Sequence, residues 1–380
     1  MFKPRTSCSL LSLQARHSLL FPGFTLAILL CLPIAVCLTA LTPWDSRSAT
    51  AEEKIDFTIL HTNDEHSALI PHSPAVDHHP EHPEDPTKGG FARLAAAIED
   101  IRGSKEAREE PVLLFNAGDF LGGTAFGWLP PEGYSPEISL LQEMGYQAAV
   151  IGNHEYDYGP ELLGNYLLDA GYPDAHQDTV MLASNTLPPR DYLLSQEGLY
   201  REKALFDLDS GLSVGVFGLI GEDAVQVAAD TGDIEFADPV ATAKEMVKEL
   251  DQEGADVIVA ITHSGVAEDR ELASRVPGLD VIVGGHSHTA LHEPIQEKDT
   301  IIVQADSLAK YLGYLELSYY PDTGELEARN RDTGRDFLVP IDNSFHPHPE
   351  IEQSVEEYRQ KLNQLIEEMT QGEVKDILDP

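Results

Sequence analysis

Short apolar runs alternate with amphipathic stretches along most of this 380-residue chain. The runs predict β-strands at residues 55–61, 112–116, 147–151, 179–184, 212–220, 256–262, 279–285, 300–305, 312–320 and 335–340. Several are continuous stretches of Val, Ile and Leu, which is typical of strands buried on both faces. Helical periodicity lies between them at residues 90–101, 135–145 and 238–254. This alternation predicts an α/β fold built in layers.

Two segments depart from this pattern. Residues 71–88 are rich in proline, histidine and acidic residues, which predicts an exposed inserted loop. A zinc site is the alternative interpretation of its four histidines, which are His72, His78, His79 and His82. Residues 351–370 carry apolar side chains at 351, 355, 358, 362, 365 and 369, a spacing that predicts an amphipathic helix. We expect that helix to pack on the domain surface, with a partner or a second domain as the alternative.

The N-terminal segment has the pattern of a targeting sequence. Lys3, Arg5 and Arg16 precede an uncharged run at 17–44 that is apolar at its centre. The small residues at 49–51 offer a cleavage site. We therefore predict that residues 1–51 are a signal peptide or, alternatively, an uncleaved N-terminal membrane anchor. Either one exports the rest of the chain, so the expected location is periplasmic or extracellular, with attachment to a membrane if the anchor is retained.

The amino-acid composition limits which metal ligands and which binding partners the chain can use. All three cysteines lie within residues 1–51, so the remainder forms no disulfide and must hold any metal with His, Asp, Glu, Asn or Gln. Residues 1–51 also hold four of the 25 basic and one of the 65 acidic residues, which leaves 21 basic against 64 acidic beyond them. This excess argues against binding a nucleic acid polymer. It predicts an acidic, solubilising surface, and we hypothesise that this surface suits a salt-rich environment.

Polar side chains follow five of the predicted strands at the point where each strand ends. Each alone has an ordinary role as a helix cap or a structural histidine. Together they supply seven nitrogen and oxygen donors, which are Asp64, His66, Asp119, Asn153, His263, His286 and His288. Because sites form outside the carboxyl ends of strands in open α/β sheets, we expect these segments at one edge. Seven buried donors without partners would be costly, whereas they suit two metal ions that share a carboxylate. Gly284 and Gly285 are expected to permit close backbone approach there.

The segments ILHTNDEH, NAGDFLGGT, GNHEYDYG, THSG and GGHSHT carry these donors in order. With KGGFARLAAAI and VQADSLAKYLGYLEL they resemble the calcineurin-like dimetal metallophosphoesterases, and within them the periplasmic 5'-nucleotidase and UDP-sugar hydrolase family. The resemblance covers residues 55–345. It implies a catalytic domain at residues 52–349 with the four-layer β-sandwich flanked by helices (αββα). Residues 350–380 would form the C-terminal amphipathic helix, with the base-binding C-terminal domain of such nucleotidases absent and nucleoside specificity therefore open.

Carried over position by position, the resemblance implies two divalent metal ions as cofactors. The implied ligands fall into two groups that share the bridging Asp119, namely Asp64, His66 and His288 on one ion and Asn153, His263 and His286 on the other. His288 stands where some members have glutamine, and an imidazole is at least as good a donor. Oxygen and nitrogen ligands without thiolate suit Mn, Zn, Fe or Co.

The resemblance also implies two catalytic residues, His154 beside the leaving group and Asp157 as its orienting partner. The two residues are three positions apart on one helical turn. The Asp157 carboxylate can therefore fix the orientation of the His154 imidazole and favour its protonated form. Asn153 and His154 would contact the substrate, whereas Glu155 and Tyr156 are expected to be structural.

The implied activity is hydrolysis of phosphate esters of nucleotides or similar small molecules by an exported enzyme. A metal-bound hydroxide would attack the phosphoryl group, and protonated His154 would assist the leaving alkoxide. Hydrolysis of cyclic phosphodiesters or sulfur esters on the same scaffold is one alternative. A metal-binding protein without catalytic activity is the other.

Overall fold

The computed structural model describes residues 54–72 and 87–374. The predicted signal peptide or anchor at 1–51, and His78, His79 and His82 of the predicted loop, lie outside the described residues. His72 forms an antiparallel bridge with Lys88, so the two ends of the segment 71–88 are adjacent. Within the described ranges, no helix combines the length and apolar character needed to cross a bilayer.

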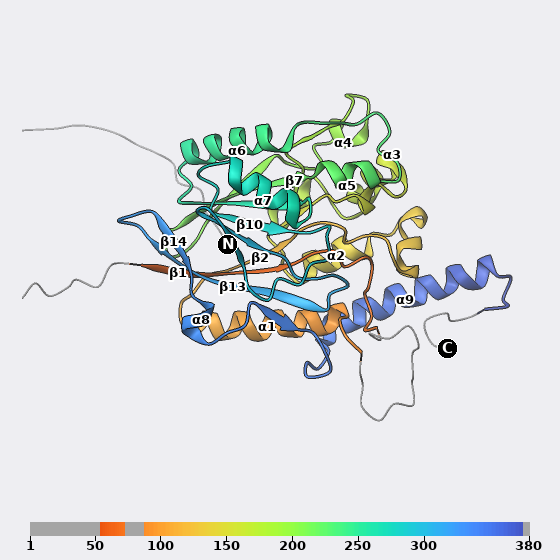
Figure 1. Ribbon diagram of the computed structural model, residues 1–380. Coiled ribbons are helices and arrows are strands. Elements are labelled where there is room, and N and C mark those ends of the chain that lie inside the picture. Colours follow the sequence, from red (N-terminus) through yellow and green to blue (C-terminus); the bar gives the residue numbers. More distant parts are fainter. Residues whose placement is uncertain (1–53, 73–86, 375–380) are drawn as a thin grey trace, which may run out of the picture. The chain divides into compact units, whose positions relative to one another are not determined.

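Two large sheets form the centre of the domain (Figure 1). The first has the strand order β14-β13-β1-β2-β3-β4, with β15 paired to β13. Its strands are β1 (Ile55–Thr62), β2 (Val112–Asn116), β3 (Ala148–Val150), β4 (Val180–Leu182), β13 (Tyr311–Tyr320), β14 (Glu325–Ala328) and β15 (Leu338–Pro340). Strands β1 to β4 run parallel, and β13 pairs antiparallel with β1.

The second sheet has the order β11-β12-β10-β9-β7-β6. Its strands are β6 (Lys203–Asp207), β7 (Ser213–Ile220), β9 (Val257–His263), β10 (Val281–Gly284), β11 (Ile295–Glu297) and β12 (Thr300–Val303). The inner four strands are parallel, and β6 and β11 close the two edges in antiparallel pairing. A separate pair joins β5 (Thr186–Leu187) to β8 (Glu235–Phe236).

The inner faces of the two sheets pack on each other, and helices cover both outer faces. Ile59 and Val259 belong to the core between the sheets, whereas their chain neighbours Leu60 and Ala260 belong to the two outer cores. Successive side chains of a strand point to opposite faces, so strands buried on both sides read as continuous apolar runs. The predicted four-layer αββα sandwich is therefore confirmed.

The helices divide between the two outer layers. Residues from α1 (Phe91–Glu106), α2 (Pro136–Glu143), α3 (Gly159–Asp169) and α9 (Pro349–Met369) pack in the core on the first sheet. Those from α6 (Pro239–Glu253) and α7 (Val266–Arg275) pack in the core on the second sheet. The short helices are α4 (Leu193–Gln196), α5 (Glu222–Val227), α8 (Asn330–Thr333), η1 (Ala125–Trp128), η2 (Pro130–Glu132), η3 (His154–Tyr156) and η4 (Asp174–Gln177).

Helix α9 is the predicted C-terminal amphipathic helix, and it packs on the domain surface as expected. Ile351, Val355 and Leu362 are buried in the same core as α1 and α2. The predicted apolar stripe is wrong at its end, because Met369 is 66% exposed and Ile366 is buried instead. Because an α-helix has 3.6 residues per turn, the buried face continues from Leu362 to position 366. The predicted spacing, which alternated steps of four and three residues, left this position out.

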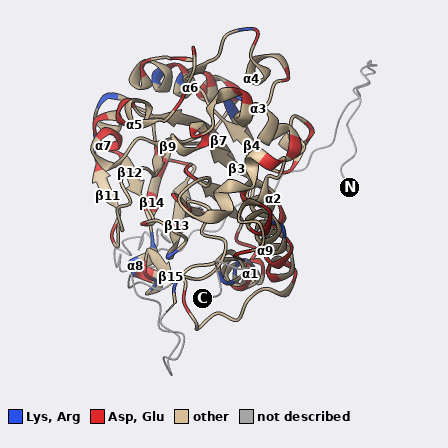
Figure 2. Cartoon of the chain, turned by 90° about the vertical axis from the view of Figure 1, so that its right-hand side faces the viewer, with Lys and Arg blue, Asp and Glu red and all other residues tan. Residues whose placement is uncertain are grey.

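Acidic side chains outnumber basic ones over the visible helices and loops (Figure 2). Mutual repulsion of these charges opposes the compact state, and salt screens it. We therefore expect the melting temperature of the purified protein to rise as KCl increases from millimolar to molar concentration. Calorimetry measures this directly, with sorbitol at matched osmolality as the control. A melting temperature that is indifferent to KCl would refute the hypothesis of a salt-suited surface.

Candidate metal centre

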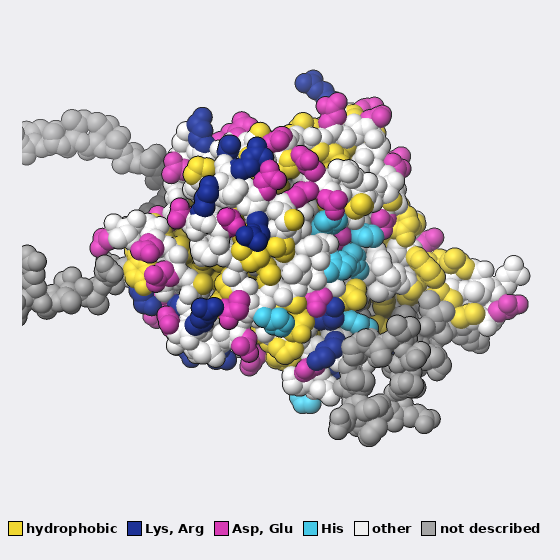
Figure 3. Space-filling view, in the orientation of Figure 1, with side chains coloured by type: hydrophobic (Ala, Val, Ile, Leu, Met, Phe, Trp, Pro, Cys, Tyr) yellow, Lys and Arg dark blue, Asp and Glu magenta, His cyan; other side chains and the backbone are white. Residues whose placement is uncertain are grey.

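All seven predicted donors meet at the carboxyl ends of parallel strands. The segments after β1, β2 and β3 come from the first sheet, and those after β9 and β10 come from the second. The expectation of one sheet edge is therefore corrected, because the site spans the aligned edges of two packed sheets. Histidine side chains gather in one area of the face seen in Figure 3.

Asp64, His66 and His288 form the first group of donors. The Nε2 atoms of His66 and His288 are 2.9 Å apart, and Asp64 Oδ1 lies 3.3 Å from His288 Nε2. Donors bound about 2.1 Å from a common ion lie roughly 3 Å from each other, so this spacing fits a shared cation. The donor chemistry also fits, because two neutral imidazoles and a carboxylate offer three lone pairs to one point.

Asn153, His263 and His286 form the second group, and Asp119 lies beside it. His263 Nε2 lies 3.0 Å from Asp119 Oδ2 and 3.1 Å from Asn153 Oδ1. His286 Nδ1 is 3.0 Å from the same Asn153 oxygen. Asp119 has donor atoms within 4.8 Å of His66 on one side and of His263 and His286 on the other. It therefore occupies the shared position between the two groups.

His263 of the second group and the adjacent Asp119 attract each other strongly. Burial disfavours the charged form of His263, but Asp119 outweighs it and raises the pKa of His263 to about 10. Burial likewise raises the pKa of Asp119, and His263 reverses this and lowers it. The site thus holds a buried carboxylate that is ionised and demands a cationic neighbour.

His154 and Asp157 lie together at the rim of the centre. His154 Nδ1 is 2.8 Å from Asp157 Oδ2, and the backbone N–H of His154 donates to Asp119 Oδ1 at 2.8 Å. The hydrogen bond to Asp157 raises the pKa of His154 to about 9, although burial opposes this. Among the protein groups alone, the His154 imidazole is therefore protonated at neutral pH, and its Nε2 is left to donate.

The backbone at the donors is held in an unusual conformation. The φ angles of Asp64, His66, Asp119, His286 and His288 are 54°, 50°, 54°, 74° and 49°. Residues other than glycine rarely adopt this left-handed region, and each such residue costs about 1–3 kcal/mol unless its surroundings fix it. Such strain clusters at functional sites, and these five residues lie in the turns that present the donors.

Buried groups that the sequence did not single out fix these turns. Gln304, fully buried at the end of β12, accepts from the Thr289 N–H at 2.6 Å and donates to the Gly285 carbonyl at 2.8 Å. It thereby holds both ends of the loop that carries His286 and His288. Asn63 donates to Asp64 Oδ2 at 2.6 Å. The predicted strand at 300–305 included Gln304, whereas β12 ends at Val303, so the signal that found the donors missed it.

Glu155 has the structural character expected of it. Its carboxylate is buried and accepts from the backbone N–H groups of Gly152, Asp119 and Leu121 at 2.6, 3.0 and 3.0 Å. It therefore ties the turn after β2 to the turn after β3.

Close backbone approach also occurs where glycines were expected. A Cβ atom on Gly285 would collide with the Ala117 carbonyl oxygen, and one on Gly284 would collide with Asp269 Oδ2. Gly285 therefore needs to be glycine because backbone closes on it, whereas at Gly284 the Asp269 side chain would have to move.

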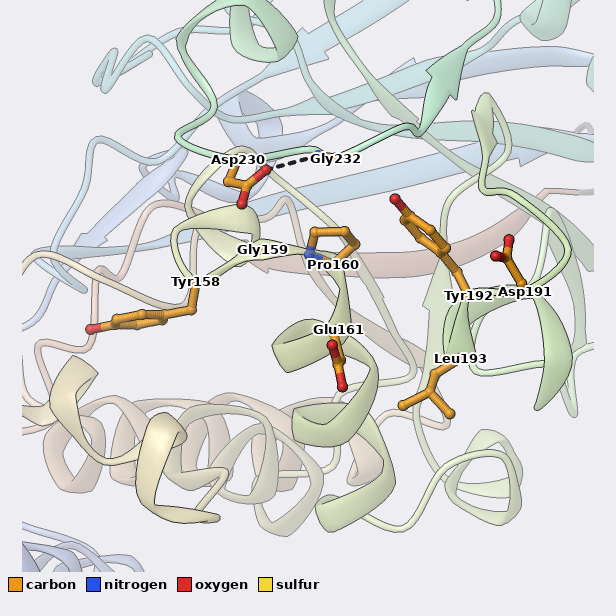
Figure 4. Close-up of a pocket in the computed structure, with 9 residues that line it drawn as sticks. All are labelled: Tyr158, Gly159, Pro160, Glu161, Asp191, Tyr192, Leu193, Asp230 and Gly232. Atoms are coloured by element: carbon orange, nitrogen blue, oxygen red, sulfur yellow. Dashed lines mark hydrogen bonds between the residues drawn. The ribbon is translucent and has the colours of Figure 1, made fainter.

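A separate pocket of about 580 Å³ begins one residue beyond Asp157 (Figure 4). Its walls include Tyr158, Pro160, Tyr192 and three carboxylates, those of Glu161, Asp191 and Asp230. None of the nine predicted site residues lines it, and no described Lys or Arg does so. An acidic pocket repels phosphate, so a phosphoryl group belongs at the donor cluster instead.

Comparison with known proteins identifies the family of the chain. The family model for the calcineurin-like phosphoesterases matches residues 57–290. A 5'-nucleotidase from Diplobatis ommata is 30% identical over 330 residues, which cover 80% of this chain and 52% of that protein. A solved 5'-nucleotidase precursor from Thermus thermophilus is 26% identical with a TM-score of 0.69, and the match covers 82% of this chain and 60% of that one. The sulfate thiohydrolase SoxB of the same species shares the fold, with 18% identity and a TM-score of 0.66 over 81% of this chain and 61% of that one.

The fold and the donor cluster thus define a metallophosphoesterase domain. The chain belongs to the calcineurin-like phosphoesterase family. It spans about half the length of the 5'-nucleotidase from Diplobatis ommata.

Proposed function

We propose that this protein is an exported, metal-dependent phosphohydrolase that cleaves phosphate esters of nucleotides or similar small molecules. The observation that carries the proposal is the arrangement of seven donors in two groups around Asp119, with His154 and Asp157 at their rim. Export rests on the predicted targeting character of residues 1–51.

The first group, Asp64, His66 and His288, would hold one divalent ion. The second group, Asn153, His263 and His286, would hold the other, and Asp119 would contact both. Two such ions, when bound, acidify a water molecule and neutralise the charge of the phosphoryl oxygens. Mn, Zn, Fe and Co all accept this set of nitrogen and oxygen ligands.

Asn153 has a second role toward the substrate. Its Oδ1 atom faces both His263 and His286, so its amide nitrogen is left to donate to a phosphoryl oxygen. One side chain thereby contacts the metal site and the substrate together.

His154 would act as the general acid. Asp157 holds Nδ1 and favours the protonated imidazole, so Nε2 can donate its proton to the oxygen of the leaving group. The exposed position of this pair suits a leaving group that extends toward solvent, because the His154 side chain is 36% exposed.

The electrostatics of the whole chain restrict where phosphate can bind. The formal net charge is −40, so the surface repels an anionic substrate. A locally cationic centre is required to reverse this repulsion, and the donor cluster is the place where cations would supply it.

A substrate panel tests the proposed specificity. We expect the protein with Mn²⁺ or Zn²⁺ to release phosphate from 5'-nucleotides, because a relative at 30% identity and a solved structure at 26% identity carry that name. The panel should include UDP-sugars, cyclic nucleotides and a chromogenic diester, assayed with and without a chelator. Activity confined to the diesters, or no phosphate release from any monoester, would reject the nucleotidase assignment.

A further inference from the structure

We propose, on the basis of the metal centre proposed above, that Asp223 is a positioning residue that fixes the ring and the tautomer of His286. We further propose that Glu268 sets the position of Asp223. The juxtaposition that carries this inference joins α5, α7 and the turn after β10, three segments that are distant in the sequence.

The two nitrogens of His286 face different partners. Nε2 lies 3.1 Å from Asp223 Oδ2, and Nδ1 lies 3.0 Å from Asn153 Oδ1 in the second donor group. A carboxylate can only accept, so the proton of a neutral imidazole belongs on Nε2. Nδ1 then keeps its lone pair directed at the donor group, which is the tautomer that a metal ligand needs.

His263 shows the same design with the opposite nitrogen. Its Nδ1 lies 2.7 Å from the Ala117 carbonyl oxygen, and its Nε2 faces the Asn153 oxygen. His263 is fully buried and a backbone carbonyl orients it, whereas the His286 side chain is partly exposed. Asp64 accepts from the His286 N–H at 2.9 Å, but this contact fixes the backbone and not the ring. Asp223 therefore supplies at His286 what Ala117 supplies at His263.

Glu268 holds the start of α5, where Asp223 is located. The first helical residues, Glu222 and Asp223, both donate their backbone N–H groups to the Glu268 carboxylate, at 2.9 and 3.0 Å. The N-cap residue of α5 is Gly221, which has no side chain to cap these groups. A Cβ atom at Gly221 would collide with Glu268 Oε2, so glycine leaves the space that the carboxylate fills. The carboxylate from α7 thus replaces a local cap and sets the direction from which Asp223 approaches His286.

The position of Asp223 fits a positioning role better than direct ligation. Its carboxylate contacts Nε2 of His286, whereas Nδ1 is the nitrogen that faces the donor group. Among the described residues, Asp223 belongs to none of the three groups whose donor atoms converge within 4.8 Å. Its side chain is 69% exposed, so replacing it leaves the core intact.

Calorimetric titration of the metal-stripped full-length protein with Mn²⁺ tests the inference without relying on activity. In D223A we expect two bound ions, one of them with affinity reduced about 10–100-fold, as removal of partners behind metal ligands typically causes. D223N should lose less of this affinity, because its amide oxygen can still accept a hydrogen bond from His286 Nε2–H. D230N is the matched control, since it removes an exposed carboxylate shortly after α5 that does not touch the donor group, and it should bind both ions as the wild type does.

A double-mutant cycle tests the role of Glu268. E268Q should weaken the same ion in the wild-type background and have little further effect in D223A, because it acts through Asp223. Wild-type affinity for both ions in D223A would overturn the inference. Equal losses of Mn²⁺ affinity in D223A, D223N and D230N would also overturn it, since the change in net charge alone would then explain the weaker binding. Loss of one ion altogether in D223A would overturn the positioning role and make Asp223 a ligand, whereas a wild-type protein that binds no Mn²⁺ would refute the metal centre itself.

Discussion

Replacing Asp119 with alanine is expected to abolish metal binding and phosphate release together. Asp119 is buried between the two donor groups, with Oδ2 at 3.0 Å from His263 Nε2 and Oδ1 accepting from the His154 N–H. Its removal takes away the one carboxylate that both ions would share and leaves His263 without its countercharge. The loss of activity should exceed the ~10²–10³-fold that removing a single transition-state donor typically costs.

Metal content by elemental mass spectrometry and phosphate release, measured on the same D119A sample, test this expectation. D119N is the control for folding, because its amide oxygen can still accept from the His154 N–H while the negative charge is lost. D119N should keep the wild-type far-UV circular dichroism spectrum and still bind metal poorly. Retention of both ions and full turnover in D119A would contradict the bridging role.

Replacing His154 with alanine is expected to leave both ions bound and to reduce turnover by ~10²–10⁴-fold, the typical contribution of a general acid. His154 contacts Asp119 through its backbone N–H, which alanine retains. The expected loss depends on the leaving group. It should be large for a nucleoside monophosphate, whose alkoxide needs a proton, and small for nitrophenyl phosphate, whose leaving group is stable without one.

The ratio of the two turnover losses, with metal content measured in parallel, tests the role of His154. D157N is the matched variant, because it keeps the shape of the partner but weakens its hold on Nδ1. Its turnover should fall less than that of H154A, and again more for the nucleoside monophosphate than for nitrophenyl phosphate. Donor atoms of His154, His66 and Asp119 lie within 4.8 Å of one another. A missing ion in H154A would therefore identify His154 as a ligand and contradict its assignment as the acid.

The inner strands of both sheets are predictable from the sequence because burial on two faces leaves a continuous apolar run. Strand β2 was predicted at its observed bounds, and β1, β7 and β9 to within one residue. The edge strands β6, β11 and β14 were missed because partly exposed strands carry mixed side chains, as in Lys203–Asp207. Helices α3 and α7 were likewise missed.

The donors could be predicted because each follows a buried strand, where a polar side chain contributes little to packing. The sequence could not show that β3 and β9 belong to different sheets, since pairing depends on contacts far apart along the chain. For the same reason it contained no sign of Asp223 or Glu268, whose only distinction is what they touch. An exposed acidic residue in so acidic a chain carries no signal until its neighbours are known.

Phosphate release from a 5'-nucleotide by metal-stripped protein, titrated with Mn²⁺ while bound Mn²⁺ is counted, tests the central claim most directly. We predict no release without metal and a rate that reaches its maximum as the second ion binds to each chain. Phosphate release that does not depend on Mn²⁺ would contradict a dimetal phosphohydrolase. A protein that holds two ions but releases no phosphate would contradict it as well.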